Sequence, residues 1–164
     1  MSPDEFARLL KRFALNPAIS TTGRHVYLWH GEENSLRGMF TSAAADSLDL
    51  HTLVASAART PFDQSESSRI IQRLMEAWVE IYLAQARQHI VLVTGCDLLA
   101  RYRVPLTTLF QWASDTVMFI LVVQNTQTRS LAGQMPEYVS FQPQATFTYL
   151  KEIVSETAII GTEG

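Results

Sequence analysis

The sequence predicts an α/β protein with a doubly wound, mainly parallel sheet that is flanked by helices, in a single domain over residues 1–164. Two continuous β-branched and aliphatic runs, 90–93 and 117–123, are typical of strands covered on both faces in a parallel sheet. Segments with helical periodicity alternate with these runs, as three-layer α/β domains require. Because ligands in such sheets bind beyond the carboxyl ends of the strands, the loops at those ends are the candidate site.

Sequence patterns place a helix at the start of the chain and alternating elements after it. Residues 2–5 (SPDE) match a capping box with Ser2 as N-cap, and apolar residues then repeat at helical spacing from Phe6 to Phe13. The other predicted elements are, in chain order, a strand at 25–29, a loop at 31–38, a helix at 39–45, a strand at 48–51, a helical turn at 52–59, a long helix at 63–88, a strand at 90–93, a helix beginning at 104–106, a strand at 117–123, a short strand at 139–141 and a closing helix at 146–156.

Composition narrows the class of protein. The formal net charge is −3 and no run of basic residues exceeds two, so charge gives no indication of nucleic-acid binding. Cys96 is the only cysteine, which excludes an intramolecular disulfide and favours a reducing, cytoplasmic location. The first residues, MSPDEFARLLKRF, lack the long apolar core of a signal peptide, and no apolar run is long enough to span a bilayer. We therefore expect a cytoplasmic protein without membrane contact.

The loop after the first predicted strand has the outline of a phosphate-binding loop. Such a loop has the spacing G-x-x-x-x-G-K-[ST], in which backbone N–H groups and a lysine hold phosphates and a hydroxyl holds magnesium. With Gly31 as the first glycine, the last three positions are Leu36, Arg37 and Gly38. Arg37 keeps a positive charge, but the second glycine and the hydroxyl are missing. The frame of a nucleotide site is present, while most of its chemistry is absent.

The loop after strand 90–93 is the second candidate part of a nucleotide site. In P-loop nucleoside triphosphatases, a strand of this kind ends in an acid that organises magnesium and the attacking water. Here the residue directly after the strand is Thr94, and the first acid is Asp97. Asp97 is therefore a candidate nucleotide-site acid, although a helix cap is the commoner role for an acid in such a loop. The sequence indicates no metal site and no catalytic residue.

Histidines offer a separate hypothesis. His30 and Glu32 lie after the first strand, and His51 lies at the end of the predicted second strand. If those two strands are neighbours, the three side chains converge and provide a small metal- or His/Glu-dependent hydrolase site. No helix carries an H-x-x-x-H pair, so a helix-borne zinc site is not indicated. Cys96, with no nameable partner histidine, is expected to be a buried small residue.

The order of these segments resembles the small P-loop proteins called BrxF, which occur in some bacteriophage-exclusion (BREX) defence systems. The resemblance is carried by LDLHTLVASAARTP at 48–61, by CDLL at 96–99 and by PEY at 136–138. It implies an AAA-like, P-loop NTPase-like three-layer fold and a role among other defence proteins. The residues that it assigns to the nucleotide site are Gly31, Arg37, Gly38, Thr94 and Asp97. This sequence departs from the family at Arg37, Gly38 and Thr94.

These observations favour a non-hydrolysing protein with a P-loop fold that acts as an adaptor or scaffold, without a required cofactor. Its expected partners are other proteins of a defence complex, and self-association is left open. The first alternative is a divergent ATPase that a partner subunit completes, with ATP held at Gly31, Arg37, Gly38 and Asp97. The second alternative is the hydrolase built on His30, Glu32 and His51.

Overall fold

A five-stranded sheet in which every strand runs parallel forms the centre of the molecule. The computed structural model describes residues 2–15, 26–39, 45–57, 64–85, 90–113, 117–123, 143–154 and 159–161. The strands are β1 (Val26–His30), β2 (Ala45–Asp49), β3 (Ile90–Thr94), β4 (Met118–Val123) and β5 (Ile159–Gly161), in the order β2-β3-β4-β1-β5. The predicted three-layer α/β class with a parallel sheet is therefore confirmed.

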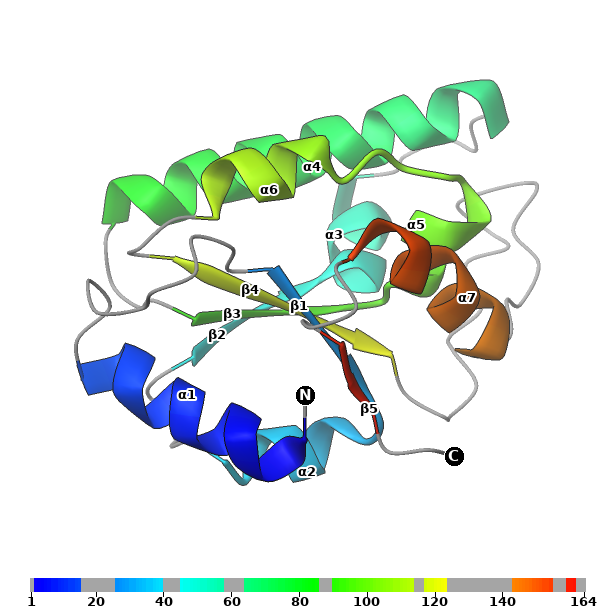
Figure 1. The fold of residues 1–164 in the computed structure, drawn as a ribbon. Helices are drawn as coiled ribbons and strands as arrows, with labels where there is room; N and C mark the ends of the chain where they lie inside the picture. Colours follow the sequence, from blue (N-terminus) through cyan, green and yellow to red (C-terminus); the bar gives the residue numbers. More distant parts are fainter. Residues whose placement is uncertain are drawn as a thin grey trace.

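Helices cover both faces of this sheet. They are α1 (Pro3–Leu15), α2 (Glu33–Arg37), α3 (Leu50–Ala57), α4 (Gln64–Gln85), α5 (Asp97–Arg101), α6 (Thr107–Trp112) and α7 (Pro143–Ile153). Figure 1 shows α1 and α2 on one face, and the long helix α4 with α6 on the other. No described helix is both long and apolar enough to cross a membrane.

Burial along the strands follows their place in the sheet. Every residue of β1 and β4 is buried, as are the first four of β3, because helices cover both faces of the central strands. Strand β2 is different: Asp46 is half-buried and Ser47 is exposed, which fits its position at the edge of the sheet. The continuous apolar runs therefore predicted the centre of the sheet, and polar residues mark its edge.

The first helix forms as its sequence predicts. The backbone N–H of Glu5 donates to Ser2 Oγ at 3.2 Å, and the N–H of Ser2 donates to Glu5 Oε2 at 3.1 Å, which completes the capping box. Phe6 and Leu10 are buried, and the Phe6 ring lies 5.3 Å from the ring of Tyr27. This helical face docks α1 on β1.

The predicted strand at 48–51 is wrong at both ends. Strand β2 starts earlier, at Ala45, and stops at Asp49, while Leu50 and His51 begin α3. The cause is helix capping: Asp49 accepts the backbone N–H of His51 at 3.1 Å and the Thr52 hydroxyl at 2.9 Å. The apolar–polar alternation of LDLH is thus shared between a strand end and a helix start.

The segment expected to be a loop at 31–38 contains α2, and the helix expected at 39–45 is contradicted at its two described residues, 39 and 45. An i,i+4 ion pair between Glu33 and Arg37 supports α2, and Gly38 ends it. Residue 39 lies in a turn, residues 40–44 lie outside the described part of the chain, and Ala45 already belongs to β2.

Among the later elements, α4 lies inside the predicted helix 63–88, and α7 begins three residues before the predicted 146. The five-residue helix α5 and the three-residue strand β5 were not predicted, since both are too short for periodicity to identify. The predicted strand at 139–141 and the PEY segment lie outside the described residues.

Candidate functional site

The carboxyl ends of the strands lie along one edge of the sheet because all five strands are parallel. Asp49 ends β2 opposite Thr94 of β3, and His30 ends β1 opposite Val123 of β4 and Gly161 of β5. This edge is where a doubly wound sheet binds ligands. The side chains along it therefore decide what chemistry the protein can perform there.

A buried histidine–aspartate pair occupies the β2–β3 part of this edge. His51 Nε2 lies 2.5 Å from Asp97 Oδ1, and the two side chains are only 5% and 2% exposed. His51 comes from the first turn of α3 and Asp97 from the first residue of α5. The pair thus joins the turn after β2 to the turn after β3. Both side chains are almost entirely covered by protein, and a bonded polar pair in such surroundings fits a structural clamp.

Gly95 has no side chain and therefore leaves room for the His51 ring. Its backbone has φ +74°, which favours glycine, and a Cβ added there would lie 2.5 Å from His51 Cδ2 and 3.0 Å from the His51 backbone nitrogen. The turn after β3 therefore passes directly against the imidazole ring of His51. A larger residue at 95 would displace either the turn or the ring.

Cys96 is buried beside this pair. Its thiol donates to the carbonyl of Val93 at 3.2 Å. Burial, and secondarily the nearby charge of Asp97, raises the pKa of the Cys96 thiol far above its usual range. The thiolate that a nucleophile or metal ligand requires is therefore disfavoured, and Cys96 behaves as the small buried residue that the sequence predicts.

Arg37 points away from the carboxyl edge. Its Nε donates to Glu33 Oε2 at 3.0 Å, and its Nη2 donates to Ser47 Oγ at 2.6 Å, in the middle of β2. Gly38 has φ −67°, an ordinary helical value, and caps α2. Arg37 and Gly38 therefore lie at the far end of α2 from the end of β1.

Some backbone groups of segment 31–38 form hydrogen bonds within the protein. The N–H of Gly31 donates to the carbonyl of Val123 at 2.9 Å and extends the β1–β4 pairing by one residue. The carbonyl of Glu32 accepts the indole N–H of Trp29 at 3.0 Å, and the N–H of Gly38 donates to Asn34 at 3.0 Å. A phosphate loop aims such N–H groups at its ligand instead. Of the four predicted cofactor-binding residues, only Gly31 and Asp97 lie at the carboxyl edge.

The histidines of the hydrolase hypothesis do not converge. Strands β1 and β2 are separated by β4 and β3, so His30, which ends β1, and His51, which follows the end of β2, belong to strand ends three spacings apart, about 14 Å. His30 instead stacks on Phe147 of α7, with ring centroids 4.1 Å apart. Within the described residues, no three histidine, cysteine, aspartate or glutamate side chains are grouped as a metal site would need.

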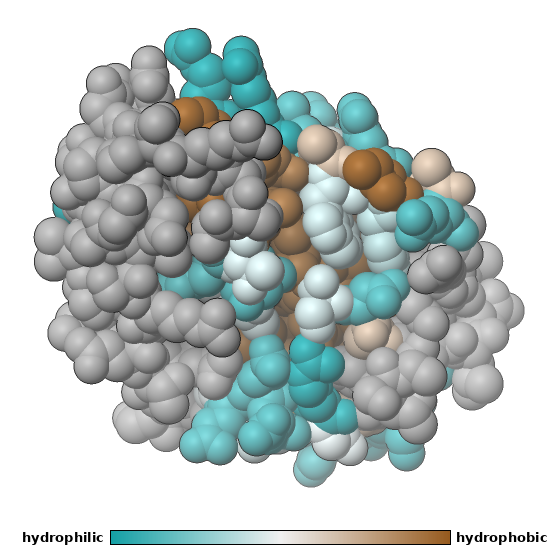
Figure 2. Space-filling view, turned by 180° about the vertical axis from the view of Figure 1, so that it is seen from behind, coloured by the Kyte–Doolittle hydropathy of each residue, from teal (hydrophilic) through white to brown (hydrophobic). Residues whose placement is uncertain are grey.

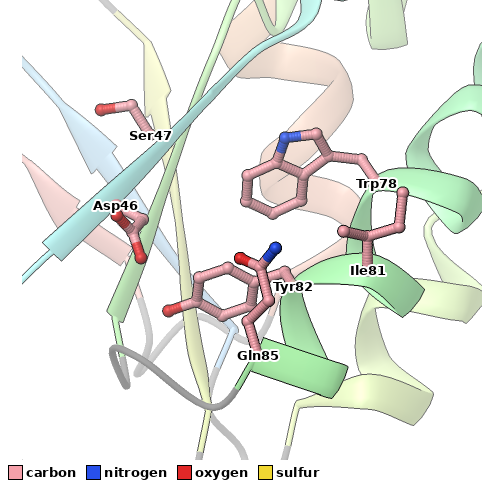
Figure 3. A pocket seen from close by; sticks show the side chains of 6 residues that line it. All are labelled: Asp46, Ser47, Trp78, Ile81, Tyr82 and Gln85. Carbon is pink, nitrogen blue, oxygen red and sulfur yellow. The ribbon is translucent and has the colours of Figure 1, made fainter.

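Sequence patterns missed two features of the molecule. The His51–Asp97 pair joins residues 46 positions apart, and no spacing rule links them. The second feature is a hollow between edge strand β2 and helix α4 (Figure 3), lined by Asp46, Ser47, Trp78, Ile81, Tyr82 and Gln85. Its aromatic residues, Trp78 and Tyr82, have the spacing of residues on one face of a helix. In a sequence that spacing indicates only core packing.

Comparison with known proteins gives no match to a protein-family model, to a curated protein or to a solved structure.

Proposed function

We propose that this chain is a non-hydrolysing protein with a P-loop-like fold that acts as an adaptor or scaffold in a bacterial anti-phage defence complex. The observation that carries the proposal is the bond between His51 and Asp97. Asp97 is the first acid after β3, beyond Thr94, which stands where a nucleoside triphosphatase has its magnesium-binding acid; here Asp97 is 2% exposed and bound to His51. A carboxylate held in this way supports the fold and is not presented to a bound metal ion.

The cation of the first loop supports the same proposal. An ATPase needs a positive charge at the terminal phosphates. Arg37 directs its guanidinium toward Glu33 and Ser47 instead. Both charged groups that the nucleotide hypothesis uses are therefore engaged in contacts within the protein.

The parallel sheet with helices on both faces supports the P-loop-like fold of the proposal. Strand β4 lies between β1 and β3, so the strand that precedes the Gly31 loop and the strand that precedes Asp97 are not adjacent. The fold thus agrees with the resemblance carried by residues 48–61 and 96–99, which is also the ground for placing the protein in a defence complex.

A thermal-shift titration with ATP and magnesium tests the absence of a working nucleotide site. At about a hundredfold excess over its dissociation constant, a bound nucleotide adds about 2.7 kcal/mol to the free energy of unfolding. That is roughly 5 to 10 °C in the melting temperature of a domain of this size. We expect no shift with ATP and magnesium beyond that with magnesium alone. A clear stabilisation at sub-millimolar ATP would overturn the proposal.

A plating assay tests the defence role. Cells that carry the complete defence system should lose phage resistance when this chain is deleted. They should keep it when Arg37 is replaced by alanine, because the adaptor needs no phosphate contact. Loss of resistance in the Arg37→Ala strain, with the variant protein present at normal abundance, would favour the divergent ATPase instead.

A further inference from the structure

The hollow between β2 and α4 combines a carboxylate with aromatic surfaces. In Figure 3 the rings of Trp78 and Tyr82 project from α4 toward the strand that carries Asp46. The two rings are stacked, with centroids 5.2 Å apart and planes 9° from parallel, so they form one packed aromatic pair. Gln85 lies one turn beyond and adds a carboxamide. A cation between a carboxylate and aromatic faces is attracted by both.

Asp46 is the acid of this hollow. The Asp46 side chain is half-buried, and no described residue forms a hydrogen bond or ion pair with it. Its neighbour Ser47 binds Arg37, and Figure 3 shows the Ser47 side chain directed away from α4. Since successive side chains of a strand point to opposite faces, Asp46 lies on the α4 side and Arg37 on the other. No basic residue is among the six that line the hollow.

The backbone beside the hollow is that of an edge strand. Strand β2 pairs with β3 on one side, and among the described strands it has no neighbour on the other. Unpaired N–H and C=O groups along a sheet edge accept an extended segment from another chain. Figure 2 shows the molecule from behind, where apolar surface appears between hydrophilic atoms. Ile81, at the rim of the hollow, is 62% exposed.

We propose that this hollow binds an arginine side chain from an extended segment of a partner protein, with that segment pairing along β2. A guanidinium suits the site because it is planar, stacks on aromatic rings and bonds a carboxylate with two N–H groups. The partner's backbone would bond the edge of β2 opposite β3, and its arginine would lie between Asp46 and Trp78.

The size of the hollow fits one long side chain. Its volume is about 190 Å³, whereas sites for drug-sized ligands have about 300 to 1,000 Å³. It also lies near the start of β2, away from the carboxyl edge where a nucleotide would bind. The inference names the partner chemistry of the proposed adaptor, and it rests on that function only in requiring a partner protein.

Binding of a synthetic peptide tests the proposal. The probe is a short acetylated and amidated peptide of alternating threonine and valine with one central arginine. Titrated into the ¹⁵N-labelled protein, it should shift the indole N–H signal of Trp78, which a Trp78→Phe variant identifies. The same peptide with citrulline keeps the shape of arginine without its charge. Its affinity should be lower by a factor of about ten or more.

Two variants locate the binding site. Asp46→Asn should weaken the arginine peptide about tenfold and leave the citrulline peptide unchanged. Glu80→Gln removes an exposed acid of the same helix that does not line the hollow, and it should leave both affinities unchanged.

Equal affinity of the wild-type protein for the arginine and citrulline peptides would overturn the proposal, whether or not Asp46→Asn folds. So would the absence of any Trp78 shift at millimolar arginine peptide. Neither result bears on the ATP titration, so a failure of this inference is distinguishable from a failure of the adaptor function.

Discussion

His51 Nε2 and Asp97 Oδ1 are 2.5 Å apart in the interior, and this bond joins the turn that follows β2 to the turn that follows β3. Polar groups in such surroundings stabilise a fold only while they remain bonded, because the low local dielectric makes a lost partner costly. The pair therefore fixes the spacing of two turns at the carboxyl edge of the sheet. The pair also engages Asp97, the acid that the nucleotide hypothesis places in the site.

Removing the histidine should destabilise the protein strongly. His51→Ala takes away the donor to a buried carboxylate, and we expect the free energy of unfolding to fall by about 2 to 5 kcal/mol. Asp97→Asn keeps the shape of the side chain and an acceptor oxygen, so the free energy of unfolding should fall less, by about 1 kcal/mol. Urea unfolding followed by circular dichroism measures both. A loss below about 0.5 kcal/mol for His51→Ala would show that the pair is not a clamp.

A methyl group at position 95 should also be costly. Gly95→Ala forces a Cβ onto a backbone with φ +74° and to within 2.5 Å of His51 Cδ2, which we expect to cost about 2 to 4 kcal/mol. In a His51→Ala background the side-chain clash disappears, so the cost of the same change should fall. A thermal or urea unfolding series of the two single variants and the double variant measures this coupling.

Gly38 is the matched control for that experiment. It has φ −67°, and a Cβ there would find its nearest neighbours at 3.5 and 3.6 Å, which is ordinary contact. Gly38→Ala should therefore leave stability unchanged or raise it by up to about 1 kcal/mol. Equal effects of Gly38→Ala and Gly95→Ala would contradict the close approach of residue 95 to His51.

Alkaline pH should destabilise the protein through Cys96. Burial raises the pKa of this thiol in the folded state, so above the ordinary thiol pKa the unfolded chain releases a proton that the folded chain retains. Below the pKa of the thiol in the unfolded chain, the contribution of Cys96 to the free energy of unfolding has its full value. It falls with rising pH by up to about 1.4 kcal/mol per pH unit. Urea unfolding between about pH 7 and pH 10 measures the slope.

Cys96→Ala is the control for the pH series. Tyr149, whose pKa burial also raises, contributes in the same direction near and above its own ordinary pKa, and it is present in both proteins. The difference between the two slopes therefore isolates the thiol. Parallel slopes, or rapid reaction of the native protein with a thiol reagent at neutral pH, would contradict the buried state of Cys96.

The centre of the fold was predictable from local pattern, and the candidate site was not. The apolar runs at 90–93 and 117–123 correspond to β3 and β4, and the capping box at 2–5 starts α1 as expected. Misassignments occurred where a side chain overrides the pattern. Asp49 caps α3 and ends a strand that alternation had extended to residue 51. The predicted convergence of His30 and His51 failed because it assumed a strand order.

The sequence by itself determined the parallel α/β class, the first helix, and the loss of most of the phosphate-loop residues around Gly31, because these depend on residue type at short spacing. Only the tertiary structure decided that β4 and β3 separate β1 from β2, that Asp97 is bound to His51, and that Asp46 faces Trp78 across a hollow. Each of these relationships joins residues far apart in the sequence. The distances between these residues are set by the order of the strands and the packing of the helices. Local periodicity contains no information about either.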